Sequence, residues 1–144
     1  MRLFREDSKV EALRSAPLFE GLSRKELEEL AKLADDLEVE AGRVLVREGE
    51  TGREFFVLME GEVEVERGGQ SLGRRGPGDF IGEIAILEDV PRTATVTVAT
   101  PLRCFVLTAQ SFRSVVDDHP EVERKVLRAL AQRLVALAND PSVS

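Results

Sequence analysis

The spacing of apolar residues changes twice along this chain. Between residues 23 and 34, and again between 108 and 138, apolar side chains recur every three or four positions, which is typical of amphipathic helices. Between residues 37 and 107 they alternate with charged or polar neighbours, which is typical of half-buried strands. The pattern therefore predicts helices over 1–36 and 108–138 on either side of a β-rich middle.

Capping residues mark the expected helix starts. Ser8–Glu11 and Ser23–Glu26 both fit the capping box, in which a serine and a glutamate three positions later bond each other's backbone N–H groups. Thr108 fits an N-cap, and Pro120 fits the first turn of a last helix that extends to about Ala138.

Glycine turns divide residues 37–107 into short segments, and no long helical pattern lies between these segments. Two of the expected strands are Thr93–Ala99 and Leu102–Leu107. About eight short strands joined by glycine turns predict a small antiparallel β jelly roll. The fold class is then α+β, and we expect residues 1–144 to form a single domain, with the roll over 37–107.

The amino-acid composition excludes several kinds of site and several classes of protein. The chain has 144 residues, a net charge of −7, one cysteine (Cys104) and one histidine (His119). Internal disulfides and the usual zinc sites are thereby excluded, and we expect no metal and no cofactor, with His119 in a loop or cap. The N-terminus lacks the apolar core of a signal peptide, and no uncharged stretch approaches the roughly 18 residues of a membrane span. These features predict a cytoplasmic protein, and the acidic surface argues against direct DNA binding.

The residues with a ligand-binding pattern lie in the segment 80–96. Gly82 permits close backbone approach to a ligand. The backbone N–H groups that follow it lack partners within the helix, and Arg92 can donate two hydrogen bonds to phosphate oxygens. Glu83 fits such a site only as an acceptor for a hydroxyl, such as a ribose 2′-OH. Two interpretations stay open on this reasoning: a ligand with a phosphate beside a sugar hydroxyl, or a buried Glu83–Arg92 ion pair.

The same segment resembles the phosphate-binding cassette of the cyclic nucleotide-binding domain family, which includes catabolite activator proteins, protein kinase A regulatory subunits and cyclic nucleotide-gated channels. The cassette reads approximately F-G-E-[LI]-A-L-[LM]-x(4)-P-R-[TSA]-A-[TS]-V, with the same nine-residue step from Glu83 to Arg92. The resemblance extends over roughly Leu13 to Leu137, and Ile81 is its one departure within the cassette.

The resemblance implies a role for each cassette residue. Arg92 would pair with the cyclic phosphate and Glu83 would accept from the ribose 2′-OH. Gly82, Ile84 and Ala85 would surround the same end through backbone groups. The ligand would be cAMP, with cGMP as the alternative.

Other residues are expected near the base. The Thr93 hydroxyl would bond a phosphate oxygen or a syn purine, so it permits cGMP. Val63, Val65 and Leu72 are candidates for the apolar wall around the base, or belong to plain roll core.

The last helix carries two apolar rows. Leu127, Leu130 and Leu134 are the candidates for covering the base. The helix is either a movable lid that closes over the purine or a rigidly packed end. Its second row would suit a homodimer or an effector contact. Because its inward rows offer only Val, Leu and Ala, we expect a modest preference for cAMP over cGMP.

A cyclic nucleotide sensor without enzymatic activity is therefore the leading hypothesis. The phosphate end has no metal set and no histidine base, which hydrolysis would require. The alternative is a ligand-free interaction domain that keeps the fold. A metal-dependent cupin would need several histidines, and residues 140–144 leave no room for a helix-turn-helix.

Overall fold

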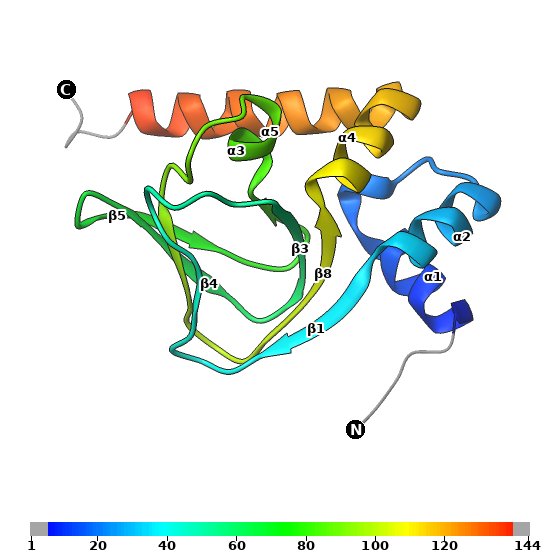
Figure 1. Cartoon of the computed structure of the whole chain (residues 1–144), viewed down its shortest axis with the longest axis horizontal. Helices are drawn as coiled ribbons and strands as arrows, with labels where there is room; N and C mark the ends of the chain where they lie inside the picture. The colour runs from blue at the N-terminus through cyan, green and yellow to red at the C-terminus, as the bar shows by residue number, and fades with distance from the viewer. Residues whose placement is uncertain (1–5, 140–144) are drawn as a thin grey trace.

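A computed structural model describes residues 6–139. Eight strands make up the middle of the chain, in agreement with the sequence prediction (Figure 1). They are β1 (Asp35–Val39), β2 (Val44–Val46), β3 (Glu54–Glu60), β4 (Val63–Arg67), β5 (Gln70–Arg75), β6 (Phe80–Ile81), β7 (Thr95–Val98) and β8 (Leu102–Thr108).

Helices flank the strands and include one short helix inside the roll. They are α1 (Glu6–Ser15), the 3₁₀ turn η1 (Pro17–Phe19), α2 (Arg24–Leu33), α3 (Glu83–Leu87), α4 (Ala109–Asp118) and α5 (Pro120–Ala138). The expected caps are confirmed at Ser23, which forms a complete capping box with Glu26, and at Thr108, whose hydroxyl accepts from the Ser111 N–H at 3.1 Å. The first capping box was wrong, because α1 already includes Glu6, so that Ser8 lies inside the helix.

Two antiparallel sheets of four strands form the roll. Their orders are β1-β8-β3-β6 and β2-β7-β4-β5. Non-consecutive strands are therefore neighbours, as in a jelly roll rather than a simple meander. The α+β jelly-roll prediction is confirmed.

Two apolar clusters hold the layers together. One fills the space between the sheets and contains Val63 and Val65 from β4 together with Leu58 and Cys104 from the other sheet. The second joins the outer face of that other sheet to the helices, where the Phe55 and Phe112 rings stack with centroids 3.9 Å apart. The helices are thus fixed to the same sheet that carries β6 and leads into α3.

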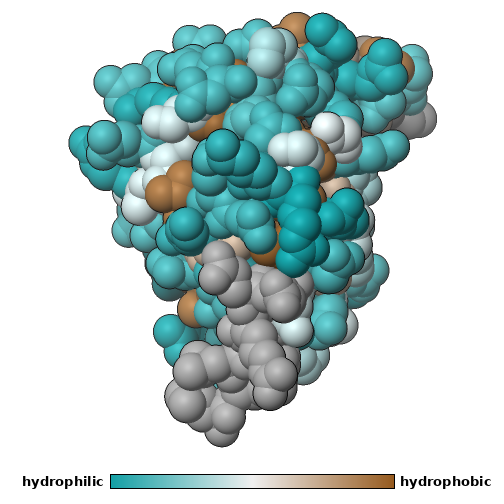
Figure 2. Space-filling view, turned by 90° about the vertical axis from the view of Figure 1, so that its right-hand side faces the viewer, coloured by the Kyte–Doolittle hydropathy of each residue, from teal (hydrophilic) through white to brown (hydrophobic). Residues whose placement is uncertain are grey.

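The surface over the helical side of the molecule is mostly hydrophilic, with small, scattered apolar spots (Figure 2). Among residues 6–139, no helix combines the length and apolar character needed to cross a membrane.

Candidate functional site

The Arg92 side chain is buried in the loop before β7, with 5% of its surface exposed. Its Nη2 donates to the Glu54 carbonyl oxygen at 2.9 Å and lies 3.6 Å from the Glu54 carboxylate. Its Nη1 is buried and makes no hydrogen bond with the described residues. Burial lowers the pKa of Arg92, against the opposing effect of Glu54 and Glu83. A buried guanidinium with an unsatisfied N–H group is costly, and native proteins supply an acceptor for such a group.

Two glycines make room for this guanidinium. A Cβ atom on Gly82 would lie 2.6 Å from Arg92 Nη1, and Gly82 has a φ of +103°, which favours glycine. A Cβ atom on Gly52 would overlap Arg92 Nε and Cζ. The expected role of Gly82, close backbone approach to a ligand, stays a prediction, and the room that it leaves for Arg92 was not foreseen from the sequence. Gly52 was missed, because its loop has no recognisable motif.

Glu83 is buried at the start of α3 and is bound by Arg133 of α5. Arg133 Nη1 lies 2.5 Å from Glu83 Oε1, while its Nη2 donates to the Phe80 carbonyl at 2.9 Å and to Asp79 at 3.3 Å. The guanidinium also lies 4.7 Å from the centre of the Phe80 ring. The described contacts therefore pair Glu83 with Arg133, and Arg92 with Glu54, in place of the Glu83–Arg92 pair that the sequence left open.

Arg133 was missed by the sequence reasoning, although a signal for it exists. It follows Val122, Val126 and Ala129 at helical spacing, on the face of α5 that packs against the apolar cluster between the helices and the roll. The expectation that the inward rows of this helix offer only Val, Leu and Ala was therefore wrong. An arginine on an otherwise apolar row indicates a buried acidic partner.

The predicted base-covering leucines occupy two different environments. Leu130 is partly buried and packs against the helical core, whereas Leu127 and Leu134 are 66% and 67% exposed. Val135 and Leu137 extend the exposed apolar row. That Leu127 and Leu134 cover a base, or that the row contacts a second copy or an effector, stays a prediction.

The remaining predicted residues lie along the roll and the cassette. Val63 and Val65 are buried between the sheets, and Leu72, at a register shift of the β4–β5 pair, is 37% exposed. Ala85 is buried and Thr93 is half-buried, while the Ile84 side chain is 38% exposed. Ile84 can therefore contribute its backbone to the site more readily than its side chain.

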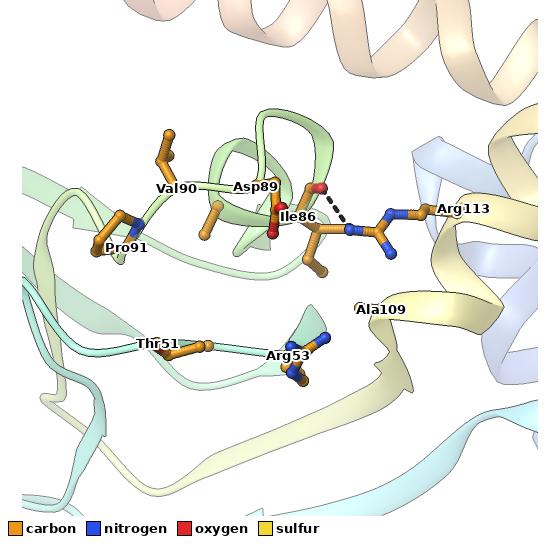
Figure 3. A pocket seen from close by; sticks show the side chains of 10 residues that line it. Thr51, Arg53, Ile86, Asp89, Val90, Pro91, Ala109 and Arg113 are labelled. Atoms are coloured by element: carbon orange, nitrogen blue, oxygen red, sulfur yellow. Dashed lines mark hydrogen bonds between the residues drawn. The ribbon is translucent and has the colours of Figure 1, made fainter.

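A cavity of about 130 Å³ lies behind the cassette (Figure 3). Gly52 and Ala85 line it, and across it Arg113 of α4 donates to the Ile86 carbonyl at 3.0 Å. Its volume is well below the roughly 300 Å³ of ordinary ligand pockets. We interpret it as the gap across which the cassette is tied to α4, rather than as a nucleotide pocket.

His119 lies at the junction of α4 and α5, as expected for a loop or cap histidine. Its Nδ1 is 3.0 Å from Glu26 Oε2 and 3.8 Å from Glu121 Oε1, and one donor atom from each of the three residues lies within 4.8 Å of the others. The expected absence of a metal stays a prediction.

The sequence matches the model of a known protein family. The family model described as the cyclic nucleotide-binding domain matches residues 36–119, more than half of the chain. This chain belongs to that family. It is a cyclic nucleotide-binding regulatory domain with an α+β jelly-roll fold.

Curated relatives place the domain in several kinds of protein. The chain is 38% identical to a cAMP-dependent protein kinase regulatory subunit of Eremothecium gossypii, over 78% of this chain and 25% of that protein. It is 31% identical to a CRP-like cAMP-activated global transcriptional regulator of Mycobacterium tuberculosis, over 86% and 58%. A putative potassium channel protein of Rhodopseudomonas palustris is 35% identical over 76% and 27%. The chain thus spans between about a quarter and three fifths of these relatives.

Two solved structures have the same fold as this chain. A mutant of a cAMP-binding acyltransferase from Mycobacterium smegmatis superposes with a TM-score of 0.79 at 32% identity, over 92% of this chain and 42% of that one. The cAMP-bound PfPKA-R fragment 141–441 superposes with a TM-score of 0.80 at 20% identity, over 96% and 49%.

Proposed function

We propose that this domain is a sensor for a cyclic nucleotide, with cAMP as the first candidate ligand and cGMP as the second. The cyclic phosphate binds Arg92 and the cassette backbone at Gly82, Ile84 and Ala85, and the ribose 2′-OH donates to Glu83. The observation that carries this proposal is the buried Nη1 of Arg92, which lacks an acceptor among the described residues.

A phosphate is the acceptor that suits Arg92 best. The Glu54 carboxylate is 58% exposed and lies on the Nη2 side, so that it leaves Nη1 without a partner. A phosphate oxygen at Nη1 would supply a charge-assisted hydrogen bond, which contributes about 1.5–3 kcal/mol. Gly82 opens the space beside Nη1, because any side chain there would lie within 2.6 Å of it.

Glu83 suits a hydroxyl donor rather than catalysis. Arg133 already neutralises it, and a carboxylate with a bound cation is a poor general base. The chain's one histidine, His119, precedes the first turn of α5, about 20 Å along the helix axis from Arg133 at 1.5 Å per residue. These surroundings support binding without hydrolysis, so we assign the domain no enzymatic activity of its own.

Helix α5 is the element that would report the ligand. Its first half is anchored, because Val122 and Val126 are buried and Lys125 Nζ donates to the Pro17 carbonyl at 3.0 Å. Its second half is held by Arg133 on Glu83, the acceptor that the ribose would use. A ligand that changes the partners of Glu83 can therefore shift the position of this half.

Calorimetric titration of nucleotide-free protein with cAMP, cGMP and 5′-AMP tests the proposal. We expect saturable 1:1 binding of a cyclic nucleotide and at least tenfold weaker binding of 5′-AMP, whose extra charge and open phosphate do not fit between Arg92 and Glu83. If neither cyclic nucleotide binds, the proposal is wrong and the ligand-free interaction domain is the better assignment.

A further inference from the structure

Three side chains with metal-binding donor atoms meet where the junction of α4 and α5 lies against α2 (Figure 1). Glu26 lies in the first turn of α2, His119 lies between α4 and α5, and Glu121 lies in the first turn of α5. His119 Nδ1 is 3.0 Å from Glu26 Oε2 and 3.8 Å from Glu121 Oε1. Two donors at about 2.1 Å from a tetrahedral zinc ion lie about 3.4 Å apart, so the observed separations are close to those of ligands that share one ion.

The two carboxylates of this group have no strong cationic partner. Within the described part of the chain, neither Glu26 nor Glu121 forms an ion pair with a lysine or an arginine, and both approach only the imidazole of His119. A cavity of about 70 Å³ adjoins the group, and Glu29 and Asp118 add two further carboxylates to its lining. Several negative charges around one imidazole attract a divalent cation, and the cavity has room for a water molecule that completes the coordination.

The donors are held in place before any ion arrives. Glu26 Oε1 accepts from the Ser23 backbone N–H at 2.8 Å in the capping box, which leaves Oε2 directed at His119. The backbone of His119 donates to the Val115 carbonyl at 3.0 Å and accepts from the Val122 N–H at 2.9 Å. Hydrogen bonds from outside the coordination sphere orient the ligands of protein metal sites in the same way. The imidazole is 17% exposed, so an ion can reach it from solvent.

We propose that Glu26, His119 and Glu121 bind a divalent transition-metal ion, with Zn²⁺ as the first candidate, and that this ion joins α2 to the start of α5. One imidazole nitrogen and two carboxylate oxygens suit Zn²⁺ with water in the fourth position, whereas Mg²⁺ prefers six oxygen ligands. The composition predicted no metal, because His119 is the chain's one histidine. The fold supplies carboxylates from two other helical turns in place of further histidines.

Calorimetric titration of the chelator-treated, nucleotide-free chain with Zn²⁺ tests the site. We expect saturable 1:1 binding that an excess of Mg²⁺ does not displace. The matched variants are Glu121→Gln and Glu123→Gln, since both residues are acidic and lie in the first turn of α5. Glu121→Gln and His119→Gln should each weaken Zn²⁺ binding at least about tenfold, and Glu123→Gln less than about twofold. Absence of saturable binding, or equal losses in Glu121→Gln and Glu123→Gln, would overturn the proposal.

Hydrogen exchange tests whether the ion joins the two segments. Zn²⁺ should increase the protection of α2 amides together with those of residues 117–123, and a hundredfold excess over the dissociation constant should raise the melting temperature by roughly 5–10 °C. Glu26→Gln, which can keep the capping hydrogen bond, should lose both effects. Protection confined to residues 117–123 would show an ion on the histidine alone and overturn the link to α2. Because these measurements use no nucleotide, their failure leaves the proposed function standing.

Discussion

Arg92 occupies the space that a side chain on Gly52 would need. A Cβ atom on Gly52 would overlap the Nε and Cζ atoms of Arg92, and a Cβ atom on Gly82 would approach Nη1 from the other side at 2.6 Å. The buried guanidinium thus lies between two glycines, one before β3 and one before α3. Its orientation depends on both residues as much as on its bond to the Glu54 carbonyl.

Gly52→Ala should therefore displace the guanidinium and weaken cyclic nucleotide binding at least tenfold. Gly52 does not have a positive φ, so alanine is tolerated by the backbone, and the melting temperature should fall by only a few degrees. Calorimetry and thermal unfolding measure the two effects separately. Gly76→Ala is the matched control, because its added Cβ would meet its nearest neighbour at an ordinary 3.7 Å. Equal affinities for both variants would contradict the steric role of Gly52.

Arg92→Ala should remove most of the affinity for cyclic nucleotide while the domain stays folded. The loss of two charge-assisted hydrogen bonds at a desolvated phosphate costs about 3–5 kcal/mol, which corresponds to a decrease of at least about a hundredfold. Arg92→Lys should rescue binding poorly, since one ammonium cannot reproduce the planar fork. Arg74→Ala, which removes an exposed arginine of β5 that pairs with Glu62 and Glu64, is the control. Wild-type affinity within threefold in Arg92→Ala would place the phosphate elsewhere.

The fold could be predicted from local signals because each of them acts at short range. Serine and threonine at the starts of α2 and α4 cap backbone groups within three residues, and alternating valines mark β4. The start of α1 was misplaced, because the serine–glutamate spacing at Ser8 also occurs inside a helix. Which strands pair was not readable from the sequence, since β3 lies between β6 and β8 through contacts of long sequence separation.

The site could be predicted only as far as its motif extends. Gly82, Glu83 and Arg92 belong to one contiguous segment, whereas Arg133 reaches Glu83 from a position 50 residues later. Long-range ion pairs depend on how helix and roll pack, and that packing is a property of the whole fold.

The capping box of α2 should make stability sensitive to acid. The backbone N–H of Ser23 donates to Glu26 Oε1 at 2.8 Å, and this bond is the main reason that the pKa of Glu26 is lowered from 4.5. Because the folded state binds this proton less readily than the unfolded state, the contribution of Glu26 is complete above pH 4.5 and is lost as the pH falls through its lower folded-state value.

Urea unfolding of wild type and Glu26→Gln between pH 3 and pH 6 checks this expectation (roughly the range over which carboxylates titrate). Glutamine can keep the capping hydrogen bond without titrating. The difference in free energy of unfolding between the two proteins should be constant in the upper part of the range and shrink below pH 4.5. A difference that is the same at every pH would show that the charge of Glu26 does not contribute.

The last prediction concerns the movement of α5. If Arg133 on Glu83 holds the second half of this helix, Arg133→Gln should increase amide hydrogen exchange over residues 130–138 in the nucleotide-free protein, and residues 120–126 should change little because Val122 and Val126 stay buried. Saturating cyclic nucleotide should alter protection over the same 130–138 segment in wild type, as the ribose takes a place on Glu83. Arg128→Gln, at an exposed position of the same helix, is the matched control and should leave exchange unchanged. A rigidly packed helix would behave differently: its protection would be the same with and without nucleotide. That result would exclude α5 as the moving part and leave the cassette, tied to α4 through Arg113 and the Ile86 carbonyl, as the route for the signal.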